Sequence, residues 1–196
     1  MFFNGNFDSM KFKVLLIAVF LISFSNSLFA QVASQKKKIN WVDIETAQEK
    51  LKDEPRKLIV DVYTTWCGWC KKMDAGTFSN PIIVDYINEH FYAVKLNAET
   101  KKDIVFNGVT YKNPNPNARR PTHELASIAA VNGRLGYPTI VYIDENLKLL
   151  SQIASYMDAR TLEPVIHFFA EEAYKTMTYE EYASTFTSSF GESKGR

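Results

Sequence analysis

The sequence predicts an α/β domain in which helices cover both faces of a central sheet. Apolar runs that suit strands alternate with segments whose apolar residues recur at helical spacing. The run Leu58–Tyr63 is apolar on both faces, which is typical of a central strand in a covered sheet. The chain has 196 residues, 46% of them hydrophobic, which is enough for one domain with a full core.

The charges of the chain are nearly balanced, with a formal net charge of +1. This balance provides no long-range field that would steer nucleic acid or acidic polymers towards the protein. We therefore expect no nucleic-acid partner, and we expect the protein to act as a monomer.

The first thirty residues have the composition of a secretory signal peptide. Lys11 and Lys13 precede an apolar run at 14–22, and small polar residues with Ala30 follow. We predict cleavage near Ala30, with 31–38 as a linker and the mature protein exported to the periplasm or another extracytoplasmic space. An uncleaved membrane anchor is the alternative, but the run is shorter than the roughly 20 residues that span a bilayer.

The N-terminal half of the domain is predicted to alternate strands and helices. The expected elements are a strand at 39–42, a helix at 43–52, a strand at 58–63, a helix from Cys67 that Gly76 and Pro81 divide, and a strand at 91–97. This β-α-β-α-β order implies right-handed crossovers within one sheet.

The C-terminal half begins with an irregular section. Asn107-Gly108 between two short apolar runs predicts a hairpin of 104–106 and 109–111 with a type I′ turn. The remaining expected elements are an Asn-Pro loop at 113–117, a short helix at 122–132, a hairpin of 139–143 and 147–153, helices at 158–174 and 179–186, and a frayed tail at 188–196.

The clearest functional signal is the stretch Cys67-Gly68-Trp69-Cys70, which contains both cysteines of the chain. Two cysteines at this spacing can form and open a disulfide with little backbone movement. A helix that begins at Cys67 would stabilise a thiolate there, because its first N–H groups are unpaired and its dipole is positive. We assign Cys67 as the nucleophile and Cys70 as the resolving thiol.

Two other roles for the cysteine pair remain open. A structural disulfide is one, although a bridge across two residues closes almost no loop and constrains the unfolded chain little. A zinc site is the other, but zinc takes about four ligands, and the three histidines show no ligand spacing relative to the pair.

Several further residues make the sequence resemble the thioredoxin superfamily over roughly 39–174. Asp61 stands in the central strand six positions before Cys67, and Trp66 directly precedes that cysteine. Lys95-Leu96-Asn97 matches a strand of the family, and Gly136-Tyr137-Pro138-Thr139 resembles the segment that contains its cis-proline. The chain looks most similar to exported bacterial thioredoxin-like proteins and to the soluble domains of transmembrane disulfide reductases.

This resemblance implies a thioredoxin fold, with a mixed central sheet flanked by helices. It places the thioredoxin-like domain at 39–176 and a C-terminal helix and tail at 177–196. It also indicates a hairpin and loop insertion at about 98–134, before the cis-proline and near the edge of the active site. Selection of a partner and a purely decorative surface loop are both open as roles for the insertion.

The resemblance suggests catalytic roles for Asp61 and Lys95. Burial of the lone carboxylate of Asp61 should raise its pKa, so that it can relay the proton that Cys70 loses. Lys95 would pair with Asp61. The alternatives are an aspartate at a strand edge that faces water and a lysine on a solvated face.

The residues around the cysteines are candidates for binding the substrate. They are Trp66, Gly68, Trp69, Tyr137 and Pro138. A cis-proline would expose the backbone of Tyr137 for strand-like pairing with a peptide. We expect Trp69 to be more exposed than Trp66; the alternative is that both rings only pack the start of the helix.

The predicted function is exported thiol–disulfide oxidoreductase, reducing protein disulfides with electrons from a membrane-bound donor and without a bound cofactor or metal. Two departures limit the comparison. Gly68-Trp69 replaces the Gly-Pro of reductive thioredoxins, and Tyr137 replaces a smaller residue. A disulfide oxidase or isomerase and a non-catalytic binding module of the same fold are therefore the alternatives.

Overall fold

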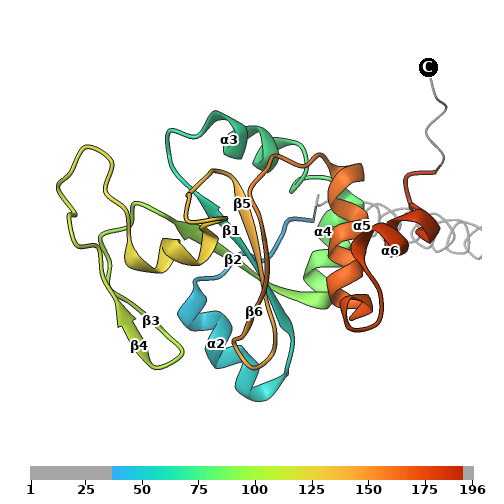
Figure 1. Ribbon diagram of the computed structural model, residues 1–196, viewed down its shortest axis with the longest axis horizontal. Coiled ribbons are helices and arrows are strands. Elements are labelled where there is room, and N and C mark those ends of the chain that lie inside the picture. The colour runs from blue at the N-terminus through green and yellow to red at the C-terminus, as the bar shows by residue number, and fades with distance from the viewer. Residues whose placement is uncertain (1–36, 192–196) are drawn as a thin grey trace, which may run out of the picture. The chain divides into compact units, whose positions relative to one another are not determined.

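A four-stranded mixed sheet forms the centre of the domain (Figure 1). The computed structural model describes residues 37–191, so the predicted signal peptide and most of the predicted linker lie outside it. The strands are β1 (Lys57–Tyr63), β2 (Phe91–Asn97), β5 (Thr139–Ile143) and β6 (Leu149–Ile153), in the order β2-β1-β5-β6. β1 pairs parallel with β2 and antiparallel with β5, which confirms the mixed sheet.

One face of the sheet is covered by four helices. They are α3 (Gly68–Ala75), α4 (Pro81–His90), α5 (Ala159–Ala170) and α6 (Tyr179–Thr185). Ile59 of β1 and Tyr142 of β5 point into the core on this side, where they pack with Met73 and Leu162. Because side chains alternate along a strand, Asp61 projects from the same face as Ile59, towards α3.

The opposite face is covered by three other elements. These are α2 (Ile44–Asp53), the 3₁₀ helix η1 (Glu124–Ala129), and the hairpin of β3 (Ile104–Phe106) and β4 (Val109–Tyr111). Leu58, Val60 and Val62 of β1 pack here, in a second core. β1 is therefore buried on both sides, as its unbroken apolar run predicts.

Side-chain caps determine where the helices begin. Asp43 accepts a hydrogen bond from the Thr46 N–H at the start of α2, and Asn80 does the same for Ile82 at the start of α4. Pro81 occupies the first turn of α4, where its missing N–H costs nothing. None of the helices formed by residues 37–191 is long and apolar enough to cross a membrane.

Two predicted elements differ from the structure. Ile39–Val42 is not a strand: Val42 forms only an isolated bridge to Val94, while Ile39 is buried against the helices. The predicted helix at 158–174 ends at Ala170 because Glu172 adopts a left-handed conformation with φ 61°. A separate 3₁₀ turn, η2 (Ala173–Lys175), follows it.

The predicted helix at 122–132 is also shortened, to η1. Its C-terminal part instead forms a turn in which Val131 and Arg134 exchange backbone hydrogen bonds of 3.0 Å. Asn132 and Gly133 both take positive φ values in this turn, which ends helical geometry.

The type I′ hairpin is confirmed, since Asn107 and Gly108 have φ values of 49° and 75°. Its expected position is wrong. Gln48 of α2 donates to the Val105 carbonyl at 2.9 Å and accepts from the Asn107 N–H at 2.7 Å. These bonds hold the hairpin against α2, away from α3 (Figure 1), so only other parts of the insertion are left to approach the cysteines.

The frayed tail predicted at 188–196 is wrong for residues 188–191. The buried carboxylate of Glu163 accepts hydrogen bonds from the Ser188 hydroxyl at 2.5 Å and the Ser189 N–H at 2.8 Å. The Arg160 guanidinium donates to the carbonyls of Phe190 and Gly191, both at 3.0 Å. Two side chains of α5, Glu163 and Arg160, therefore anchor the segment.

Replacement of Glu163 by Gln should lower the free energy of unfolding at pH 7 by about 1–3 kcal/mol, because the amide leaves buried donors poorly paired. Burial alone would raise the pKa of Glu163, but the bonds from Ser188 and Ser189 outweigh it and lower the pKa. The stability that this group contributes is therefore present above pH 4.5 and is lost as the pH falls through the lower folded pKa.

Urea unfolding of the two proteins between pH 3 and pH 7 measures this effect. The difference between them should shrink on acidification. Equal stability at pH 7 would show that the segment is not anchored by Glu163.

Candidate functional site

Cys67 and Cys70 are joined by a disulfide at the N-terminus of α3. Cys67 is the N-cap residue, and its Sγ accepts a hydrogen bond from the Cys70 N–H at 3.0 Å. Cys67 is 5% exposed and Cys70 is 2% exposed. The first sulfur thus lies where the unpaired N–H groups of the helix point, and the second lies one turn further in.

Asp61 and Lys95 lie opposite each other in the parallel pairing of β1 and β2. The Lys95 ammonium contacts the Asp61 carboxylate at 2.6 Å, and Asp61 is 1% exposed. This burial excludes the alternative in which Asp61 faces water at a strand edge. The ion pair that the sequence allowed is present because the register aligns both residues on the α3 face.

Lys95 has a second carboxylate partner that was not predicted from the sequence. Asp74 of α3 also forms an ion pair with the Lys95 ammonium. Asp74 follows Cys70 by one helical turn, so its position on the same helix face was a usable signal. The ammonium is further enclosed by the aromatic rings of Trp41, Tyr63 and Phe78, whose centroids are 4.9, 5.0 and 5.5 Å away.

These surroundings shift the pKa of Asp61 upwards. Burial is the main cause; Lys95 opposes it by stabilising the carboxylate, and the negative charge of Asp74 adds to the upward shift. The Oδ1 atom of Asp61 is buried and has no hydrogen-bond partner among the described residues. Asp61 is therefore a carboxyl group with one oxygen committed to Lys95 and one available for a proton.

Both tryptophans beside the cysteines are exposed. Trp69 is 56% exposed and Trp66 is 49% exposed. Trp69 is thus the more exposed of the two, as predicted, but the difference is small. The Trp66 indole donates to the Glu99 carboxylate at 2.8 Å and meets the Tyr137 ring edge-on at 6.0 Å. Trp69 packs instead against Tyr156, with ring centroids 5.2 Å apart.

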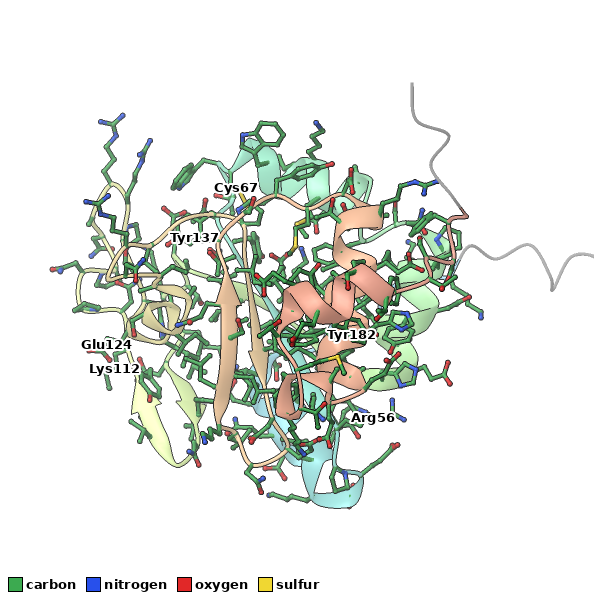
Figure 2. All side chains as sticks on the ribbon, turned by 45° about the vertical axis from the view of Figure 1, so that its right-hand side comes forward. Arg56, Cys67, Lys112, Glu124, Tyr137 and Tyr182 are labelled. Atoms are coloured by element: carbon green, nitrogen blue, oxygen red, sulfur yellow. A yellow bond between two sulfur atoms is a disulfide. The ribbon has the colours of Figure 1, made fainter. Side chains whose placement is uncertain are left out.

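The segment before β5 completes this face of the molecule. The Tyr137–Pro138 peptide bond is cis. Cys67 and Tyr137 lie at one end of the molecule in Figure 2, whereas Lys112 and Glu124, at the base of the hairpin, lie further down. Gly68 is exposed at the first position of α3, where no atom crowds its missing Cβ.

Two cations on this face were not predicted. The Arg120 guanidinium lies 4.5 Å from the centroid of the Trp66 ring, and the Lys72 ammonium lies 4.7 Å from that of Trp69. Lys72 is close to the cysteines in sequence, but Arg120 comes from the loop of the insertion. Nothing in the sequence around Arg120 indicated this contact, because it depends on where the loop folds.

The described residues contain no group of three or more histidine, cysteine, aspartate or glutamate side chains arranged to hold a metal ion. The chemistry that the arrangement offers is that of its two sulfurs. They can exchange between disulfide and dithiol beside a buried carboxyl group and an exposed aromatic surface.

Comparison with known proteins identifies the family. The thioredoxin-like domain family matches residues 44–170, so the chain belongs to this family. An uncharacterized protein of Caenorhabditis elegans is 24% identical over 101 residues, which are 52% of this chain and 12% of that protein. The chain thus spans about an eighth of the length of that relative.

One solved structure supports the fold. A thioredoxin-fold protein from Helicobacter pylori superposes with a TM-score of 0.50 at 22% identity, over 77% of this chain and 84% of that one. A thioredoxin from Thermus thermophilus gives a TM-score of 0.49 at 14% identity, over 69% and 88% of the two chains. The fold and the Cys-x-x-Cys disulfide together are of the thiol–disulfide oxidoreductase kind.

The raised pKa of Asp61 predicts a specific loss of stability with pH. The stability that its protonation supports is full below the unfolded value of 3.8 and is lost as the pH rises through the folded pKa. A tenfold difference in proton affinity between the folded and unfolded states corresponds to about 1.4 kcal/mol. Asp61→Asn should abolish this loss in the oxidised protein. Asp74→Asn should reduce it, because it removes a negative charge that raises the pKa of Asp61 and leaves Lys95 paired with Asp61 only.

Urea unfolding of the oxidised proteins from pH 4 to pH 8 provides the measurement. The difference between wild type and Asp61→Asn isolates this group from all others. A constant difference across the range would contradict a raised pKa.

Proposed function

We propose that this protein is an exported thiol–disulfide oxidoreductase that reduces protein disulfides through a mixed disulfide at Cys67, which Cys70 resolves. The observation that carries the proposal is the position of the cysteine pair. Cys67 caps α3, and the face of the sheet beneath the helix holds the buried carboxyl group of Asp61. A purely structural bridge would need neither feature.

In the first step, the Cys67 thiolate attacks one sulfur of the substrate disulfide. A bond forms between Cys67 Sγ and that sulfur while the substrate disulfide breaks, and the second substrate sulfur leaves as a thiolate that takes a proton from solvent. The helix N-terminus favours the attacking thiolate because its unpaired N–H groups and dipole stabilise negative charge.

In the second step, Cys70 loses its proton and attacks Cys67 Sγ. This forms the Cys67–Cys70 disulfide and releases the first substrate sulfur as a thiolate, so that two electrons have passed from the protein to the substrate. We assign the Asp61 carboxylate as acceptor of the Cys70 proton, since burial shifts the pKa of Asp61 upwards, towards neutral pH. Lys95 positions and partly neutralises that carboxylate.

Substrate recognition is assigned to the exposed surface around Cys67. Trp66, Gly68 and Trp69 are close neighbours of Cys67 in the chain. The residue before the cis-proline, Tyr137, contacts Trp66 with its ring. The backbone at Tyr137 would pair with an extended peptide of the substrate in the manner of an added strand. The bound peptide would place its disulfide over Cys67.

The cycle requires an electron donor that reduces the Cys67–Cys70 disulfide again. The signal-peptide pattern of the first thirty residues supports work outside the cytoplasm, where disulfides persist. We assign a membrane-bound dithiol reductase as the donor, since no bound cofactor is needed for exchange between sulfurs.

Variants of the two cysteines test the proposal. Wild type should reduce a model protein disulfide with dithiothreitol as donor, and Cys67→Ser should lower the rate to the uncatalysed level. Cys70→Ser should accumulate mixed disulfides on Cys67, because the resolving thiol is gone; non-reducing electrophoresis of trapped cell extracts detects them. Failure of wild type to reduce any model disulfide would favour a binding module.

The reduction potential of the cysteine pair tests the direction of electron flow. Equilibration with glutathione buffers gives the potential, and roughly 30 mV corresponds to a tenfold change in the equilibrium constant. We expect a value near −270 mV, as in a reductase. A value near −120 mV would instead assign the protein as an oxidase.

A further inference from the structure

We propose that the active-site face selects substrate disulfides that lie beside acidic residues, and that Arg120 and Lys72 make this selection. The inference rests on the proposed function and adds a substrate class to it. It comes from a feature that the exchange chemistry does not use: each exposed indole beside Cys67 carries a cation over its ring.

The two cations come from different parts of the chain and lie at the two tryptophans that flank Cys67. Arg120, from the insertion, lies 4.5 Å from the centroid of Trp66. Lys72, from α3, lies 4.7 Å from the centroid of Trp69 and 5.0 Å from that of Tyr156. A peptide bound over Cys67 would therefore meet an aromatic surface and a positive charge at each tryptophan.

Neither cation forms an ion pair with a carboxylate of the described part of the chain. Ion pairs within residues 37–191 engage Lys57, Lys95 and other bases, but not Arg120 or Lys72. Contact with a ring face holds a cation in place and leaves its N–H groups free to bind an anion. Arg119 and Lys71, next to them in the chain, are also exposed.

The acidic groups near these tryptophans form no ion pair with the two cations. Glu99 is bonded to the edge of the Trp66 indole at 2.8 Å rather than to Arg120. The Asp74 carboxylate forms its ion pair with Lys95. Glu99 keeps its negative charge because the indole is neutral, but the exposed cations Lys71, Lys72, Arg119 and Arg120 outnumber it. The whole chain, by contrast, has a net charge of only +1.

Acidic side chains next to a substrate disulfide are the chemistry that fits. A carboxylate can bond to the Arg120 fork or the Lys72 ammonium while apolar neighbours pack on the indoles. Each exposed charge pair of this kind should raise kcat/KM about 1.4- to 5-fold, and salt weakens such pairs. Both cations together should give a preference of roughly 2- to 25-fold for acidic over neutral flanks.

Three peptides that share one disulfide loop but carry Glu, Gln or Lys flanks test the proposal. With dithiothreitol as donor, kcat/KM of the full-length protein should fall in the order Glu, Gln, Lys. The ratio of Glu to Gln peptides should approach one in 0.5 M NaCl. Equal values on all three peptides at low salt would overturn the inference while leaving the proposed function intact.

Charge variants identify the groups responsible. Arg120→Gln and Lys72→Gln should each lower the ratio of Glu to Gln peptides about 1.4- to 5-fold. Arg120→Lys should retain most of the ratio because it keeps the charge. Lys148→Gln is the matched control: Lys148 is exposed in the turn beyond the far end of β5, and its loss should leave the ratio unchanged.

Binding without chemistry separates the two proposals. The Cys67→Ser/Cys70→Ser double variant should bind the oxidised peptides in the same order, as measured by calorimetry. If wild type reduces none of the peptides but the double variant keeps this order, the proposed function fails and the acidic preference stands. If the double variant binds all three equally, or if Lys148→Gln changes the ratio as much as Arg120→Gln, the preference is overturned.

Discussion

The buried ion pair of Asp61 and Lys95 is the interaction on which the arrangement of the site depends. A carboxylate in the middle of an apolar strand is costly to bury, and its cost is reduced only if a cation meets it there. The parallel register of β1 and β2 provides that cation at 2.6 Å. Asp74 ties the same ammonium to α3, so the sheet and the helix that carries the cysteines meet at one charged contact.

The two faces of the sheet carry different parts of the molecule. The face with α3 holds the charged cluster and the cysteines, and its other helices pack a core rich in aromatic rings. The opposite face is covered by α2, η1 and the inserted hairpin, which are joined to it by apolar contacts. The insertion contributes to both, because its hairpin is held by Gln48 while its loop carries Arg120 to Trp66.

The surface around Cys67 combines elements from distant parts of the chain. Trp66 and Trp69 flank the sulfur, Tyr137 arrives from the segment before β5, and Arg120 arrives from the insertion. Cys67 is only 5% exposed, so a partner must fit this surface before the sulfurs can meet. Reactivity is thus a property of the helix start, whereas selectivity would be a property of the rings and charges around it.

Local sequence patterns predicted most of the elements and the central residues of the site. Helical spacing, Asn107-Gly108 and the apolar run at 58–63 are local patterns. They predicted most of the helices, the first hairpin and β1 because such preferences act between near neighbours. Tertiary packing determines the contacts of Asp74 and Arg120, the place of the hairpin beside α2 and the anchoring of 188–191 by Glu163. Those contacts join residues from separate elements, and their formation depends on how the elements pack rather than on any pattern along the chain.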